Sequence, residues 1–102
     1  MGPGKAQLLE LIRDTGSISA AGRAMGMSYR RAWLLVDAMN TAFRAPLVES
    51  ARGGAAGGGA RLTETGQAAL AAYRALQSAA NAAAAPHLAA MQALIPDVSN
   101  GK

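Results

Sequence analysis

The sequence contains no cysteine and only one histidine. The absence of cysteine excludes a disulfide framework and a thiolate metal site, and His87 by itself cannot form a zinc site. Aromatic residues are also scarce, at 4%, while alanine dominates the apolar half of the composition. Because alanine favours helix but adds little volume to a core, we expect one modest helical domain that is elongated or depends on a partner.

The signatures of several protein classes are missing as well. No run of about 18 uncharged apolar residues with large side chains is present, and the N-terminus lacks the pattern of a secretory signal. Acidic residues are scattered, with no carboxylate pair, catalytic triad, metal cluster or nucleotide-binding loop. We therefore expect a cytoplasmic protein that is not an enzyme, contacts no membrane and uses no cofactor.

Positive charge is concentrated in one stretch of the chain. The formal net charge is +4, and residues 23–61 carry all of it, with six arginines against Asp37 and Glu49. The charges outside this stretch cancel. A localised positive field attracts polyanions such as nucleic acids, although an ordinary solvated surface is the other reading of such a cluster.

The first quarter of the chain has the spacing of two short helices. Apolar residues at helical intervals predict an amphipathic helix over 5–14, ended by Gly16. Ser19 is the predicted N-cap of a helix of about two turns that ends before Gly26. Between the two helices, Ile18 either fills the core or pairs as a strand of one or two residues.

A longer helix is predicted over 29–43, with Ser28 as its N-cap. A short capped helix, a glycine-containing turn and a longer capped helix are typical of a helix-turn-helix. At 100° per residue, Arg30, Trp33, Leu34 and Asp37 point outward. The residues predicted to face the core step by three and four, namely Ala32, Leu35, Val36, Met39 and Phe43.

Arginine and tryptophan on the outer face of this helix suit a helix whose first turns enter the major groove of DNA. Arginine makes the commonest specific contact with guanine, and hydroxyl groups at a helix start bind phosphate. An equally good interpretation places Trp33 at the edge of the core. Ser17, Ser19 and Ser28 can likewise be simple helix caps. The predicted DNA contacts in this region are Ser17, Ser19, Ser28, Tyr29, Arg30, Arg31, Trp33 and Leu34.

Residues 47–49 and 61–63 are predicted to form two short strands. The segment between them holds five glycines in the seven residues 53–59, and we expect it to be a flexible loop. A hairpin after a helix-turn-helix is a wing, and Arg52 and Arg61 at its flanks are predicted to contact the DNA backbone. The predicted fold class is therefore mainly α, a winged helix-turn-helix over residues 1–63.

Thr63 is the predicted N-cap of a long helix that runs to Pro86. A shorter helix is expected over 87–95, so that residues 64–96 form a dimerisation unit and residues 97–102 a tail. Small and apolar residues recur along the long helix with a spacing of three and four, which favours close helix packing against a second copy, although a helix that only covers its own domain is the other reading. The predicted interface residues on this helix are Ala69, Tyr73, Leu76 and Ala80.

The chain resembles the N-terminal DNA-binding domain of ModE-type molybdate-responsive regulators, which is related to the winged helix of LysR-type regulators. The resemblance covers about residues 5–80 and rests on GSISAAGRAMGMSYRRAWLLVDAMN at 16–40, PLVE at 46–49, GGGA before Arg61 and LTETG at 62–66. It implies a winged helix, a homodimer and a role in transcription regulation. It also implies that the first helix, through Leu8 and Leu11, joins the dimer contact.

Two departures from that family qualify the expectation. No segment of the chain could form the oxyanion-binding domains of full-length members, so we expect no molybdate binding. Ala55 and Ala56 stand where the family's wing often carries a basic residue, so wing contacts with DNA are expected to be weaker. The alternative function is a winged-helix module for protein interaction that has lost sequence-specific DNA binding, a reading that the outward Trp33 and Leu34 favour.

Overall fold

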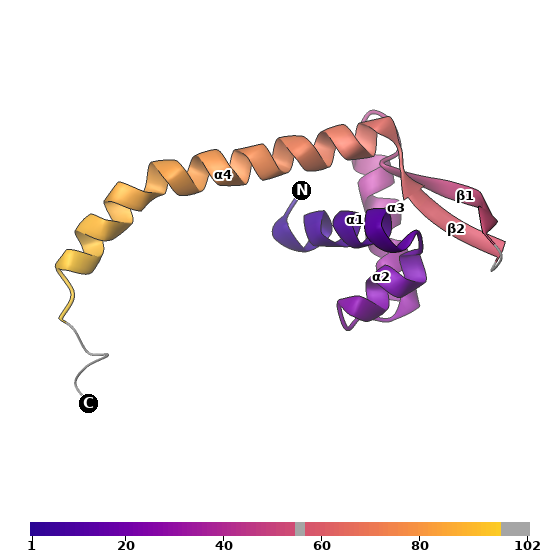
Figure 1. Ribbon diagram of the computed structural model, residues 1–102, viewed down its shortest axis with the longest axis horizontal. Helices are drawn as coiled ribbons and strands as arrows, with labels where there is room; N and C mark the ends of the chain where they lie inside the picture. Colours follow the sequence, from indigo (N-terminus) through magenta and orange to yellow (C-terminus); the bar gives the residue numbers. More distant parts are fainter. Residues whose placement is uncertain (55–56, 97–102) are drawn as a thin grey trace.

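The computed structural model describes residues 1–54 and 57–96, with the side chains of residues 52–58 outside the description. It is an elongated winged helix with extents of 57 × 32 × 20 Å, in which α1, α2, α3 and a hairpin cluster at one end while α4 extends away from them (Figure 1). The elements are α1 Pro3–Thr15, α2 Ile18–Ala24, α3 Tyr29–Ala42, β1 Val48–Gly54, β2 Gly57–Leu62 and α4 Glu64–Ala93. The predicted fold class is confirmed.

The junction between α1 and α2 differs from the sequence-based expectation. Gly16 ends α1 in the left-handed conformation, with φ 71°, as predicted. The N-cap of α2, however, is Ser17 rather than Ser19, because the Ser17 hydroxyl accepts the hydrogen bond from Ala20 N at 3.0 Å. Ile18 is thus the first residue of α2 and not part of a strand. The backbone contact with the hairpin is made instead by the carbonyl of Gly16, which accepts from Ala60 N at 3.0 Å.

A close contact between α2 and α3 sets the geometry of the helix-turn-helix. A Cβ atom added at Gly22 would lie 2.8 Å from the Cβ of Ala32, so only glycine lets the two helices approach this closely. Gly26 makes the turn with φ 72°. Ser28 then caps α3, accepting from Arg31 N at 3.1 Å, as the sequence predicts. The helix ends at Ala42, one residue before its predicted end.

One small core lies between α1, α3, the base of the hairpin and the first turns of α4. The predicted inner face of α3 is confirmed, with Ala32, Val36 and Met39 buried and Leu35 and Phe43 partly buried. No buried side-chain nitrogen or oxygen in the described part of the chain lacks a hydrogen-bond partner. The largest fully buried side chains are Leu8, Leu9, Ile12, Val36, Met39 and Leu47.

The hairpin is longer than predicted, because most of the glycine-rich stretch is strand and not loop. The strands are antiparallel, with Val48 opposite Leu62 and Ala51 opposite Gly59, and the register is irregular between Ala51 and Gly54. Glycine weakens a strand but keeps both backbone hydrogen-bonding groups, so it can still continue a ladder. The prediction that concerns Ala55 and Ala56 falls outside the described residues.

The N-terminus of α4 is fixed by hydrogen bonds to the segment before β1. Thr63 caps the helix, accepting from Gly66 N at 2.9 Å, and its hydroxyl donates to the carbonyl of Pro46 at 2.7 Å. A Cβ atom at Gly66 would lie 2.1 Å from the carbonyl oxygen of Leu47, so α4 begins in direct backbone contact with the wing base. Thr63 N also donates to that carbonyl, at 3.0 Å.

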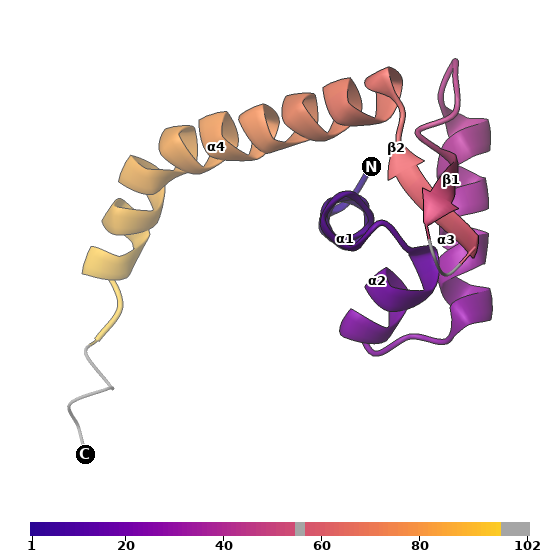
Figure 2. The ribbon, with the colours of Figure 1, turned by 45° about the vertical axis from the view of Figure 1, so that its right-hand side comes forward.

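The separate helix expected over 87–95 does not form, because α4 continues through Pro86 to Ala93. Proline removes one backbone donor, but the strong helix preference of the alanines on both sides is enough to continue the helix. α4 curves in this region, as Figure 2 shows. None of the helices described is both long and apolar enough to cross a membrane. The tail predicted over 97–102 falls outside the described residues.

Candidate nucleic-acid interface

The N-terminal half of α3 is the most exposed part of the helix-turn-helix. Arg30 and Arg31 are exposed, and neither forms an ion pair with another residue in the described parts of the chain. The exposed fractions of the large side chains here are 57% for Tyr29, 44% for Trp33 and 57% for Leu34. Two unpaired arginines therefore lie beside an exposed apolar group at the start of one helix.

Tyr29 and Trp33 form a pair one turn apart on α3. The indole nitrogen of Trp33 donates a hydrogen bond to the hydroxyl oxygen of Tyr29. Trp33 also lines two depressions between α3 and the hairpin, and it is 44% exposed. Trp33 thus lies at the edge of the domain, and its predicted contact with DNA stays a prediction.

A hollow of about 260 Å³ brings several of the predicted contact residues together. It lies where the starts of α2 and α3 meet the hairpin. Ser19 also accepts a hydrogen bond from Arg23, at 3.0 Å, which holds that arginine against the surface of α2. The hydroxyl-bearing residues that line the hollow are Ser17, Ser19, Tyr29 and Ser50.

The wing arginines differ from those on α3, because one of them has an ion-pair partner. Arg61 donates to Glu49 on the opposite strand at 2.8 Å, and both side chains are largely exposed. Exposed pairs of this kind are weak, so Arg61 can exchange its carboxylate partner for a phosphate. The side chain of Arg52 lies outside the description, and its predicted DNA contact stays a prediction.

Asn40 is a structural residue of the site that the sequence analysis missed. Its side-chain oxygen accepts from Leu47 N at 2.9 Å and from Val48 N at 3.1 Å, and its side-chain nitrogen donates to Val48 O at 3.1 Å. These three bonds fasten the wing base to the last turns of α3. The asparagine stands at the end of the VDAMN segment, but its side-chain bonds cross to a separate element, which helical periodicity does not reveal.

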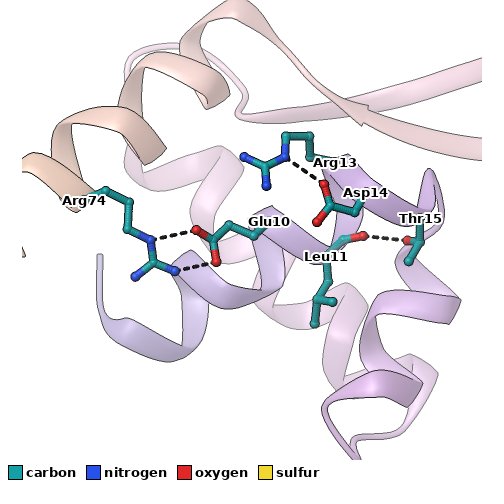
Figure 3. Close-up of polar contacts among 6 residues, drawn as sticks. All are labelled: Glu10, Leu11, Arg13, Asp14, Thr15 and Arg74. Carbon is teal, nitrogen blue, oxygen red and sulfur yellow. Dashed lines mark hydrogen bonds and ion pairs between the residues drawn. The ribbon is translucent and has the colours of Figure 1, made fainter.

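An ion pair between Glu10 and Arg74, called here the joint, connects α1 with α4 (Figure 3). Arg74 donates two hydrogen bonds to the carboxylate of Glu10, at 2.7 Å from Nε and 2.5 Å from Nη2, and a third to Gln77 at 2.6 Å. The hydrogen bond from Arg74 holds the pKa of Glu10 below its usual value, and the same bond raises the pKa of Arg74. This joint fixes the direction in which α4 leaves the domain.

The residues predicted for a dimer contact fall into three groups. Leu8 is fully buried in the core of its own chain and offers no surface to a second copy, so the structure removes it from that set. Leu11, Ala69 and Tyr73 are partly buried against the same core. Leu76 and Ala80 are exposed on α4. Beyond Gln77, every residue of α4 except Ala84 is exposed.

Comparison with known proteins places these features in context. The model of the family described as bacterial regulatory helix-turn-helix protein, lysR family, matches residues 4–67.

Among the described residues, no three histidine or acidic side chains are grouped so that they could hold a metal ion.

Curated relatives match most of this chain. The molybdenum-pterin-binding protein MopB of Rhodobacter capsulatus is 51% identical over 76% of the chain and 29% of its own length. The molybdenum transport protein ModE of Azotobacter vinelandii is 42% identical over 72% of the chain and 27% of its own length. The chain thus spans less than a third of these relatives.

Among solved structures, the crystal structure of a CbnR_DBD–DNA complex is similar, with a TM-score of 0.67. The match covers 89% of this chain and 99% of the other, at 21% identity. At that identity the likeness concerns the fold.

Proposed function

Because the chain belongs to the lysR family of bacterial regulatory helix-turn-helix proteins, we propose that it binds double-stranded DNA as a homodimeric transcriptional regulator. In this proposal, α3 enters the major groove and the hairpin follows the sugar-phosphate backbone. The single observation that carries it is the start of α3, where Arg30 and Arg31 are exposed and without an ion-pair partner in the described parts of the chain. A free guanidinium can bind guanine or phosphate without first breaking an internal bond.

The surroundings of α3 support the same function. Ser17, Ser19 and Ser28 place hydroxyl groups at the starts of α2 and α3, where they cap the helices or hold an arginine and can also donate to phosphate oxygens. The excess positive charge of the chain lies in residues 23–61, which include α3 and the wing. Long-range attraction and local contacts therefore favour the same surface.

An apolar face that runs along α4 from Tyr73 to Met91 supports the homodimer. At 100° per residue, Tyr73, Leu76, Leu88 and Met91 share one face, and the last three are 54–63% exposed. An isolated helix with exposed leucines is marginal in water, whereas pairing with a second α4 would bury that face. Two copies joined in this way would present two α3 helices to the DNA, so two half-sites about 34 Å apart are expected.

Titration of the protein against a random-sequence duplex library at several salt concentrations tests DNA binding. We expect the affinity to fall steeply as salt rises, and the double variant Arg30→Ala/Arg31→Ala to lose sequence selection. Each arginine that binds a base is expected to contribute about 5- to 150-fold in affinity. Sequence-selective binding that survives in the double variant would contradict the proposal.

A protein-interaction module is the second candidate, and the exposure of Trp33 and Leu34 is the observation that favours it. Such a module would show no shift of DNA at low salt, and Trp33→Ala would reduce capture of a protein partner while leaving the fold intact. A salt-dependent shift of the duplex library decides for DNA binding.

A further inference from the structure

The outer face of α3 carries an apolar group next to its arginines. Tyr29, Trp33 and Leu34 are each about half exposed, although the buried core of the described residues contains no aromatic side chain. They lie within two turns of helix, on the end of α3 that follows the Ser28 cap. Large apolar side chains gathered on a surface mark a contact with another molecule more often than a purely solvated face.

Hydrogen bonding within the group leaves it with little polar character. The only polar atom of Trp33 is its indole N–H, and that group already donates to the Tyr29 hydroxyl. Leu34 has no polar side-chain atom. Only the hydroxyl hydrogen of Tyr29 is left to donate. This part of α3 therefore offers carbon surface to its ligand, in contrast to the neighbouring Arg30.

The major groove contains one apolar group on the base edges, which is the C5-methyl of thymine. We propose that α3 recognises thymine through this methyl group, with Trp33 and Leu34 as the residues that determine specificity. The inference rests on the proposed function, because it requires α3 to lie in the major groove. It adds to that function the identity of a base and the chemical group by which the base is selected.

The position of the thymine relative to the arginine contact follows from helix geometry. Trp33 and Leu34 are three and four residues after Arg30, so all three side chains lie on one face of α3 about one turn apart. One turn rises about 5.4 Å, which is roughly one to two base-pair steps. A thymine is thus expected within about two base pairs of the base or phosphate that Arg30 contacts.

Replacement of thymine by deoxyuridine tests the inference with the unchanged protein, because it removes only the methyl group. Binding sites are first selected from a random-sequence duplex library, and each enriched thymine is then replaced in turn. We expect at least one replacement in each half-site to weaken binding about four-fold, the value for loss of one buried methyl-sized group. Thymines outside the groove contact are expected to tolerate replacement.

Variants then assign the effect to the side chains. Leu34→Ala and Trp33→Ala should each reduce the affinity ratio between thymine and deoxyuridine sites toward one. Leu34 is exposed on a helix, so its replacement should preserve the fold even if the Trp33 variant does not. Asp37→Asn, on the same face of α3 but beyond the apolar group, should keep the ratio of the unchanged protein.

The outcomes separate this inference from the proposed function. Absence of binding to any duplex overturns both. Selective binding with equal affinity for thymine and deoxyuridine at every position overturns the methyl recognition and leaves DNA binding standing. Discrimination that persists in both Leu34→Ala and Trp33→Ala also overturns the assignment to these residues.

Discussion

The two halves of α4 have similar alanine-rich sequences, but the first half packs against the core and the second half is exposed to solvent. In the first half, Gly66 and Leu70 are buried and Tyr73 packs against the core, while Arg74 is tied to Glu10. In the second half, from Ser78 onward, every residue of α4 is exposed except Ala84, which is partly buried. Alanine forms helix in both places, but only contacts with other elements determine where the helix lies. The first half is thus part of the winged helix, and the second half is a free arm available to a partner.

The largest expected effect concerns the apolar face of α4 that runs from Leu76 into the arm. In the double variant Leu76→Glu/Leu88→Glu, two charges lie on the apolar face and would be buried in a dimer, so we expect a complete shift to monomer and about a hundred-fold loss of affinity for paired half-sites. Light scattering coupled to size exclusion measures the mass. Ala82→Glu, on the opposite face of the same helix, is the matched control and should remain dimeric. If the double variant stays a dimer, the arm is not the interface.

In the first half of α4, stability should depend most on the contact between the helix and the wing base. Gly66→Ala places a methyl group 2.1 Å from the carbonyl oxygen of Leu47, and backbone atoms on both sides would have to move. We expect a loss of about 3 kcal/mol in the free energy of unfolding, measured by urea denaturation. Gly4→Ala in α1 meets no atom within 4 Å and should be neutral or stabilising.

The link between α3 and the wing is expected to contribute somewhat less. Asn40→Ala removes three hydrogen bonds and leaves the amides of Leu47 and Val48 without their partner. We expect a loss of about 2 kcal/mol on urea denaturation, with a weaker wing contribution to DNA affinity. Asn81→Ala, on the exposed arm, should change the stability by less than about 0.5 kcal/mol. Equal effects of the two substitutions would show that the Asn40 hydrogen bonds contribute no more to stability than an exposed side chain of the arm.

The smallest expected effect is the pH dependence of the joint between α1 and α4. The pKa of Glu10 is lowered in the folded protein by the Arg74 hydrogen bond, so the joint is fully stabilising above the unfolded pKa near 4.5 and is lost as the pH falls through the folded value. Glu10→Gln should therefore lower the melting temperature at pH 7 by less than about 4 °C, and by a smaller amount at pH 3. Thermal scans at the two pH values measure this, and an equal decrease at both would show that the charge plays no part.

Local chemistry made several features predictable from the sequence. The caps at Ser28 and Thr63, the end of α1 at Gly16 and the inner face of α3 follow from residue types at fixed spacing, and the structure confirms them. The sequence predicts Ser19 as the N-cap of α2, whereas the structure has Ser17. Both serines are good capping residues, and only the path of the chain after Gly16 selects between them.

The sequence by itself determined that this chain forms a helix-turn-helix followed by a wing, and it located the arginines that face outward, because these depend on periodicity and on local hydrogen bonds. Only the tertiary structure decided that glycine-rich residues extend the strands, that α4 continues through Pro86, that Leu8 is a core residue and that Asn40 holds the wing. The roles of Leu8 and Asn40 depend on contacts between separate elements, which helical periodicity does not reveal, whereas α4 continues through Pro86 because the alanines on both sides prefer helix.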